Sequence, residues 1–262
     1  MFGFGQKKPL LDEDTILWMF DCYGWALRNF DSRVFYQETV LVTPSNEHFP
    51  GRADHAGEMA SLIFGRVQHF AGLDHWPCHL MNANQIQQLE LPKVRYDGAL
   101  RGSEAQSLVS VDESQYLPFV YDEFMLNDPE VLIASYAHLF AHYLGSTAQE
   151  SLPGSQEYWP FVTELLASFL GFGVIMANTA HTAKIRSCGS CSGPAVERTN
   201  FLSPLEMTYA LAIFCHLKKI PLKTISRNLK KSLLPFYKKA EKDVLARGAD
   251  FEEWHKQSTS LA

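Results

Sequence analysis

Two histidines and a glutamate are the residues whose types and spacing best suit chemistry in this chain. His138 and His142 stand four positions apart in the segment 128–145, which reads DPEVLIASYAHLFAHYLG. In a helix, side chains at positions i and i+4 project from the same face, so both imidazole rings would point into one space. Two imidazole nitrogens and one carboxylate oxygen form an ordinary zinc site, with a fourth position left for water or substrate.

Glu164 is the candidate for the third ligand. It lies in the apolar segment 158–178, YWPFVTELLASFLGFGVIMAN, which we expect to be a second helix. On a helical projection Glu164 shares a stripe with small or uncharged residues, namely Ser168, Gly171, Ile175 and Asn178. The histidines are also flanked by small residues, namely Ala134, Ser135, Ala141 and Gly145. Because small residues let helices approach closely, the pattern predicts that His138, His142 and Glu164 face one another.

Local signals define the ends of both helices. Asp128 is a good N-cap, Pro129 fits the first helical position, and Gly145 is a plausible C-terminal stop. Pro160 fits the first turn of the second helix, where its missing N–H costs nothing. The sequence therefore predicts two closely packed helices joined by the loop 145–159.

The two helices carry a resemblance to known metallopeptidases. AHLFAHYLG resembles the A-H-E-x-x-H helix of zincins, and TELLASFLGFG resembles the segment that brings the acidic ligand in the gluzincin branch. The chain is also similar to a family of bacterial zincin-like proteins, and the segment 201–214, FLSPLEMTYALAIF, looks like one of its later motifs. This resemblance, over residues 35–240, implies an α+β, mostly helical fold with a small sheet beside the histidine helix. It implies zinc bound by His138, His142 and Glu164.

Leu139 is the departure from the zincin pattern. Zincins place a glutamate directly after the first histidine, and this glutamate moves the proton from the metal-bound water to the leaving group. Leucine can do neither, and a missing general base typically costs about 10² to 10⁴ in rate. The sequence therefore predicts a zinc-binding, peptidase-like protein with a degenerate active site and without peptidase activity.

Two alternatives stay open. The first is an active zinc hydrolase whose general base has moved, and Glu150 and Glu157 in the loop 145–159 are the candidates. The second is a metal-free interaction or scaffold protein, in which the histidines are structural and the basic C-terminal helix contacts an acidic peptide or protein partner. A metal analysis of the purified protein would separate the metal-binding hypothesis from the scaffold hypothesis.

A pair of cysteines could form a second metal site. Cys188 and Cys191 have the C-x-x-C spacing of half a zinc ribbon, but no second half follows in the sequence. We interpret them as reduced loop cysteines; the alternative is a metal site completed by Cys78, His79 or a second subunit. The histidines of the first half, and His181, are expected on the surface or in packing.

The last predicted helix, 222–246, is strongly basic. Its apolar stripe faces the core, and Pro235 must kink or split it. The basic residues opposite this stripe are Lys223, Arg227, Lys230, Lys231, Lys238, Lys239 and Lys242. A charge run of this kind is usually a solvated face. With 23 basic and 29 acidic residues the net charge is −6, so we do not expect a nucleic-acid partner.

The composition predicts one cytoplasmic domain. The 262 residues with 46% hydrophobic content suffice for a single zincin-like domain, 1–262, with an α/β part at 1–127 and a helical part at 128–262. No secretory pattern opens the chain, and the five cysteines suggest no disulfide framework. The longest apolar run, 161–177, is interrupted by Glu164, Gly171 and Gly173, so no membrane association is expected.

Periodicity predicts the remaining elements. Helices are expected at 14–30, with its aromatic residues in the core, at 58–70, and at 204–217, where Ser203 and Glu206 form a capping box. Strands are expected at 39–43, 78–81, 94–100 and 117–121, which would give a sheet of three or four strands. The strand 117–121 should lie nearest the histidine helix. The polar region 99–114 is expected to be a mobile insertion.

Overall fold

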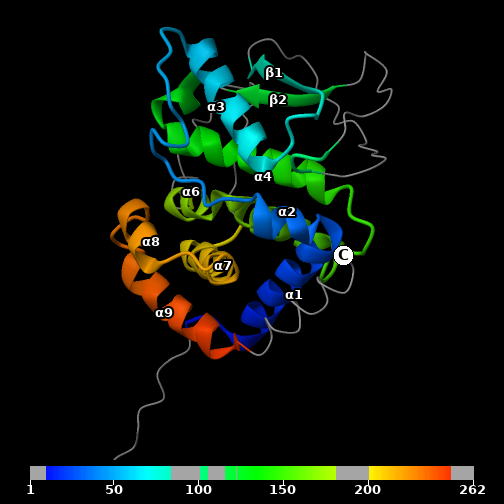
Figure 1. Cartoon of the computed structure of the whole chain (residues 1–262), viewed down its shortest axis with the longest axis vertical. Helices are drawn as coiled ribbons and strands as arrows, with labels where there is room; N and C mark the ends of the chain where they lie inside the picture. The colour runs from blue at the N-terminus through cyan, green and yellow to red at the C-terminus, as the bar shows by residue number, and fades with distance from the viewer. Residues whose placement is uncertain (1–9, 84–100, 106–115, 122, 181–200, 249–262) are drawn as a thin grey trace, which may run out of the picture.

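Helices dominate the computed structural model, with one small sheet at the edge (Figure 1). The structure describes residues 10–83, 101–105, 116–121, 123–180 and 201–248. The α-helices are α1 (Glu13–Asn29), α2 (Ser32–Gln37), α3 (Ala56–Ala71), α4 (Pro129–Gly145), α5 (Trp159–Ala167), α6 (Gly173–Thr179), α7 (Pro204–Leu217), α8 (Leu222–Asn228) and α9 (Leu234–Ala246). Shorter turns are η2 (Glu123–Asn127), η3 (Gln156–Tyr158) and the π-helical η4 (Ser168–Phe172). The α+β, mostly helical class is confirmed.

The described sheet consists of β1 (Cys78–Asn82) and β2 (Leu117–Tyr121), which pair in parallel with Leu80 opposite Phe119. Both strands were predicted. The sheet lies beside α3 and α4 (Figure 1), and the Tyr143 hydroxyl of α4 donates to the carbonyl oxygen of Pro118 at 3.0 Å. The expected position of the strand 117–121 next to the histidine helix is therefore confirmed. The expected strand 94–100 lies outside the described residues.

The strand expected at 39–43 is wrong. These residues are extended, as their β-branched side chains favour, but they join no sheet. The segment instead crosses the most buried helical stretch of the protein, and the Val42 N–H donates to the carbonyl oxygen of Gly171 at 2.9 Å. A kinked helix, rather than another strand, supplies the backbone partner.

The single helix expected at 158–178 is interrupted. It begins as α5, continues through η4 and resumes as α6, and Gly171 inside η4 has φ of 101°. A π-helical turn of this kind frees backbone groups from the regular ladder, which explains the carbonyl that receives Val42. The kink also interrupts the stripe that was expected to run from Glu164 to Asn178.

A buried arginine ties several helix ends together. Arg101 donates to the carbonyl oxygen of Phe30 at 3.2 Å, after α1, and to the Thr39 hydroxyl at 2.6 Å. Its guanidinium also lies over the ring of Phe169 in η4, 5.3 Å from the centroid. Burial lowers the pKa of Arg101 to about 10, which leaves it charged at neutral pH. The region 99–114 was expected to be a mobile insertion, but its residue Arg101 is part of the core.

The C-terminal helices follow their local signals. The capping box of Ser203 and Glu206 opens α7, as predicted. The basic segment 222–246 is split into α8 and α9, and Pro235 lies in the first turn of α9, where its ring is tolerated. In Figure 1, α7 is surrounded by α6, α8, α9 and α1, and this group forms the lower half of the core.

One described helical stretch is long and apolar enough to cross a membrane. It comprises residues Gln156–Thr179, and 89% of its most apolar window is buried inside the protein. A stretch buried to this degree is the core helix of a folded domain.

We expect Gly171→Ala to destabilise the protein by roughly 3 kcal/mol, because a Cβ at this position would overlap the carbonyl oxygen of Val40 and the backbone there has positive φ. Gly65→Ala is the matched control. Gly65 lies in α3 with open space around it, so alanine should stabilise by roughly 0.5–1 kcal/mol. Urea denaturation measures both variants, and equal midpoints would contradict the proposed close approach at Gly171.

Candidate functional site

The two helices that carry the expected site pack against each other. Asp128 caps α4 through the Val131 N–H, and Pro129 lies in the first turn, as predicted. The close approach occurs at Gly145, where a Cβ would meet the Trp159 ring at 2.7 Å and Leu166 at 2.9 Å. The small residues of α4 therefore do bring α5 close, which was the premise of the expected site.

His142 is held by the first residue of α5. Its Nδ1 accepts a hydrogen bond from the indole N–H of Trp159 at 3.1 Å, and the two ring centroids lie 5.4 Å apart. The ring is half-buried. His138, one turn earlier on α4, is also half-buried. Both histidines therefore lie at the boundary between the core and the surface.

The contact with Trp159 fixes the tautomer of His142. An indole nitrogen can only donate, so Nδ1 carries the lone pair and the neutral ring has its proton on Nε2. Histidines that bind zinc usually show the opposite arrangement. One ring nitrogen binds the metal, and the N–H of the other ring nitrogen donates to a carbonyl or carboxylate oxygen. Zinc binding through Nε2 of His142 would require the ring to release Trp159 and change tautomer.

The environment also keeps His142 neutral. Burial lowers the pKa of His142 below its ordinary value of 6.5. Protonation would place a second N–H against the indole donor, so the charged ring would lose this hydrogen bond as well. His142 therefore behaves as a neutral hydrogen-bond acceptor within the fold.

Glu164 is fully buried in α5. Its Oε2 accepts the backbone N–H of Leu202 at 2.8 Å, and Leu202 lies just before α7. A carboxylate oxygen engaged in this way connects two helices that are far apart in sequence. The structure thus gives Glu164 a role in holding the fold.

The expected ligands do not form a metal-binding group as they stand. Among the described residues, no three His, Cys, Asp or Glu side chains come together in a way that could hold a metal ion. His138, His142 and Glu164 are therefore brought onto packed helices but not into one coordination sphere. Zinc binding at these residues stays a prediction, and it would require rearranged side chains.

The second expected metal site is only partly described. Cys188, Cys191 and His181 lie outside the described residues. Cys78 and His79 are successive residues of β1, so their side chains point to opposite faces of the strand. Burial raises the pKa of the Cys78 thiol to about 12, which favours the thiol over the thiolate that zinc requires.

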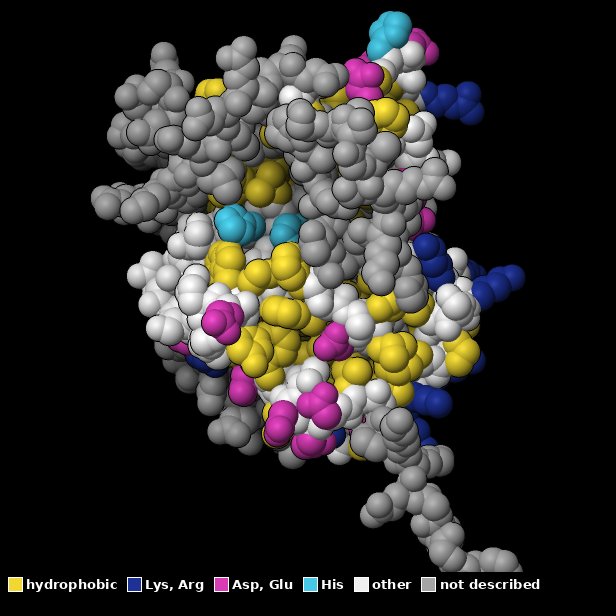
Figure 2. Space-filling view, turned by 180° about the vertical axis from the view of Figure 1, so that it is seen from behind, with side chains coloured by type: hydrophobic (Ala, Val, Ile, Leu, Met, Phe, Trp, Pro, Cys, Tyr) yellow, Lys and Arg dark blue, Asp and Glu magenta, His cyan; other side chains and the backbone are white. Residues whose placement is uncertain are grey.

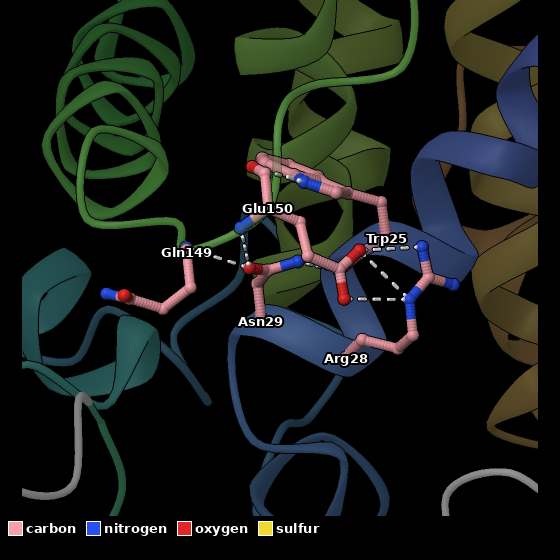
Figure 3. A network of polar contacts seen from close by, with 5 residues as sticks. All are labelled: Trp25, Arg28, Asn29, Gln149 and Glu150. Atoms are coloured by element: carbon pink, nitrogen blue, oxygen red, sulfur yellow. Dashed lines mark hydrogen bonds and ion pairs between the residues drawn. The ribbon is translucent and has the colours of Figure 1, made fainter.

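The structure describes both the zincin base position and the two glutamates that could replace the missing base. Leu139, at the zincin base position, is a half-buried side chain packed against the core. Glu150 is paired with Arg28 of α1, with Oε2 at 2.9 Å from Nη2 (Figure 3). Hydrogen bonds from Arg28 lower the pKa of Glu150, which makes this carboxylate a weaker base. Glu157 is exposed on η3.

Glu150 belongs to a network that fixes the loop between α4 and α5 onto the end of α1 (Figure 3). The Asn29 side-chain oxygen accepts the backbone N–H groups of Gln149 and Glu150 at 3.0 and 3.1 Å. The Trp25 indole donates to the carbonyl oxygen of Glu150 at 3.2 Å. The loop that was expected to carry a relocated base is instead anchored to α1.

A chain of aromatic rings next to this loop was not predicted. Trp18 contacts Tyr158 at 5.5 Å between centroids, Tyr158 contacts Phe161 at 6.1 Å, and Phe161 contacts Phe201 at 5.8 Å. Tyr158 is 45% exposed and Phe201 is 39% exposed. We call these four residues the aromatic face. The core position expected for the aromatic residues at 14–30 is confirmed for Phe20, Trp25 and Phe30, whereas Trp18 is half-buried and packs against the core.

Figure 2 shows a broad group of hydrophobic side chains on one side of the protein, with histidine side chains at its upper border. Acidic side chains lie among the hydrophobic ones, and Lys and Arg lie toward the edge of this view. One signal in the sequence marked the α1 part of the aromatic face: Asp14, Leu17, Trp18 and Asp21 share a helical stripe that mixes carboxylates with apolar residues.

No protein-family model, curated protein or solved structure matches this chain. The resemblance to zincins therefore depends on the sequence motifs of the two helices and of the segment 201–214.

We expect the neutral state of His142 to stabilise the protein above pH 6.5, and this stabilisation to be lost as pH falls below 6.5. The reason is that the pKa of His142 is lower in the folded protein than in the unfolded chain, so the unfolded chain binds the proton first. His142→Asn keeps an acceptor for Trp159 but does not titrate. Urea denaturation from pH 7.5 to about pH 5 should show a larger loss in the wild type than in this variant. His48, His75 and His216, whose pKa values burial also lowers, are common to both proteins and cancel. Parallel pH curves would contradict the assigned contact.

Proposed function

We propose that this protein is a non-catalytic binding protein, built on a zincin-like helix pair, that recognises a peptide or protein partner in the cytoplasm. The observation that carries the proposal is the use of Glu164 and His142 in hydrogen bonds of the fold itself, to Leu202 and Trp159. The groups that zincins dedicate to a metal ion serve here to join α5 to α7 and α4 to α5.

The absence of a suitable base supports a non-catalytic role. Leucine at position 139 cannot accept the proton of an attacking water. Glu150 is directed to Arg28 on α1, and the lowered pKa of its carboxylate makes proton abstraction less favourable. A zinc peptidase would need both a base and a metal ion at one point, and among the described residues no three His, Cys, Asp or Glu side chains could hold a metal ion as placed.

The surroundings of the helix pair support recognition of a partner. Exposed aromatic side chains are enriched where proteins bind other proteins, because they bury a large area with few rotatable bonds. The aromatic face includes Tyr158, which directly precedes Trp159, the residue that donates to His142. The binding function is therefore proposed for the same side of the protein as the former metallopeptidase motif.

We expect protein purified without a His-tag or chelator to contain far less than one equivalent of zinc, and its metal content to be the same in His138→Ala and His142→Ala. Elemental analysis of the three proteins measures this. One equivalent of zinc that is lost in both variants would overturn the structural role of the histidines. Zinc that survives both substitutions would instead belong to another site, such as Cys188 and Cys191.

We expect no hydrolysis of unfolded protein substrates, with or without added zinc, because the proton transfer has no carrier. Leu139→Glu, which restores the H-E-x-x-H pattern, should also be inactive as long as Glu164 and His142 keep their present partners. Zinc-dependent hydrolysis by the wild type that is lost in Glu150→Gln or Glu157→Gln would show a relocated base and overturn the proposal.

A further inference from the structure

We propose that the aromatic face is the docking surface for a basic amphipathic helix of a partner protein. This inference rests on the proposed binding function and names its partner class. Three parts of the chain supply the surface: Trp18 comes from α1, Tyr158 and Phe161 from η3 and α5, and Phe201 from the segment before α7. Leu17, beside Trp18, adds a further exposed apolar side chain.

The aromatic face is held rigidly before any partner arrives. The Trp18 indole donates to the carbonyl oxygen of Pro153 at 3.0 Å, so its polar end is satisfied. Gly154 lies under Tyr158, where a Cβ would come within 3.2 Å of the ring. The loop beneath is fixed by Arg28 and Asn29 (Figure 3). Because little flexibility is lost on binding, more of the contact energy remains as affinity.

The spacing of the rings suits a helix. Successive centroids are 5.5, 6.1 and 5.8 Å apart. One helical turn rises about 5.4 Å, so apolar side chains at positions i, i+4 and i+7 of a partner helix would meet successive gaps between rings. An extended peptide would present side chains on one face about every 6.6 Å, with each intervening residue turned away. This repeat is longer than all three ring spacings, so the match favours an amphipathic helix.

The charges around the aromatic face select a basic partner. Asp14 and Asp21 flank Leu17 and Trp18 on the exposed stripe of α1, and Glu157 directly precedes Tyr158. Within the described part of the chain, no Lys or Arg forms an ion pair with these three carboxylates. Lys or Arg of a partner could pair with them and lie over the Trp18 or Tyr158 ring.

The same charges argue against two other ligands of exposed aromatic surfaces. Nucleic acids and anionic membranes both carry dense negative charge, which the three carboxylates would repel. The arginines that the structure places at α1 are already engaged: Arg28 pairs with Glu150, and Arg247 after α9 pairs with Glu13 and Asp243. A basic helix of another protein is therefore the occupant that both the spacing and the charge favour.

The experiment uses the full chain and a fluorescein-labelled peptide of about 18 residues, five helical turns, with Leu and Trp on one face and Lys on the other. A peptide of identical composition in scrambled order, and one with Glu in place of Lys, are the ligand controls. Fluorescence anisotropy should show binding of the basic amphipathic peptide that weakens as salt rises, and much weaker binding of both control peptides.

Substitutions locate the site. Tyr158→Ala and Phe201→Ala remove exposed rings, so each should weaken binding about tenfold, and Glu157→Lys should weaken it and reduce its salt dependence. Phe124→Ala is the matched control: Phe124 is an 83% exposed aromatic residue on η2, outside the aromatic face, and its loss should leave binding unchanged.

Several results would overturn this inference. They are no binding of the basic peptide at millimolar protein, equal binding of the scrambled peptide, and equal effects of Phe124→Ala and Phe201→Ala. Phosphatidylserine vesicles or a single-stranded RNA bound through Tyr158 and Phe201 would also overturn it, as would a dimer of this chain that Phe201→Ala dissociates. If the peptide does not bind and the protein has neither zinc nor peptidase activity, the docking proposal is wrong but the proposed non-catalytic function stands. If the protein contains stoichiometric zinc at His138 and His142, the proposed function itself is wrong.

Discussion

A carboxyl group inside the most apolar helical stretch must have hydrogen-bond partners, and this requirement governs the packing around Glu164. An unpartnered polar group in such a place costs on the order of several kcal/mol. The backbone N–H of Leu202 meets Oε2 at 2.8 Å, which fixes the chain at the entrance to α7. From there α7 packs against α6 and α9, so one buried hydrogen bond positions much of the lower core.

The same reasoning explains why a motif for metal chemistry can serve a structural purpose. Histidine and glutamate are useful at metal sites because they present nitrogen and oxygen lone pairs in a defined direction. A backbone N–H or an indole N–H uses those lone pairs equally well. In this protein Trp159 donates to Nδ1 of His142 and Leu202 donates to Oε2 of Glu164, so both lone pairs serve contacts between helices of the fold.

The sequence was sufficient where the signals are local. Asp128 and Pro129 define the start of α4, and Ser203 with Glu206 defines the start of α7, because caps act within one helical turn. The strand expected at 39–43 failed because its hydrogen-bond partner is a helix kink more than a hundred residues away. The kink depends on Gly171, whose positive φ has meaning only once Val40 lies against it.

In the candidate site, too, local features were predictable and contacts between distant residues were not. Periodicity correctly placed His138 and His142 on one helix next to α5. The tautomer of His142, however, depends on Trp159 across the loop, and the hydrogen bond of Glu164 depends on Leu202, 38 positions further along the chain. The aromatic face escaped prediction for the same reason, since Trp18, Tyr158 and Phe201 meet only in the folded protein.

The tautomer of His142 is the most direct test of whether these residues serve the fold or a metal. Long-range ¹⁵N–¹H correlation NMR of the imidazole side chains, recorded before and after one equivalent of zinc, reports which ring nitrogen carries the proton. We expect the proton of His142 on Nε2, with a spectrum that zinc does not change. A proton on Nδ1, together with an Nε2 resonance that shifts when zinc is added, would contradict the structural role of His142 and identify it as a metal ligand.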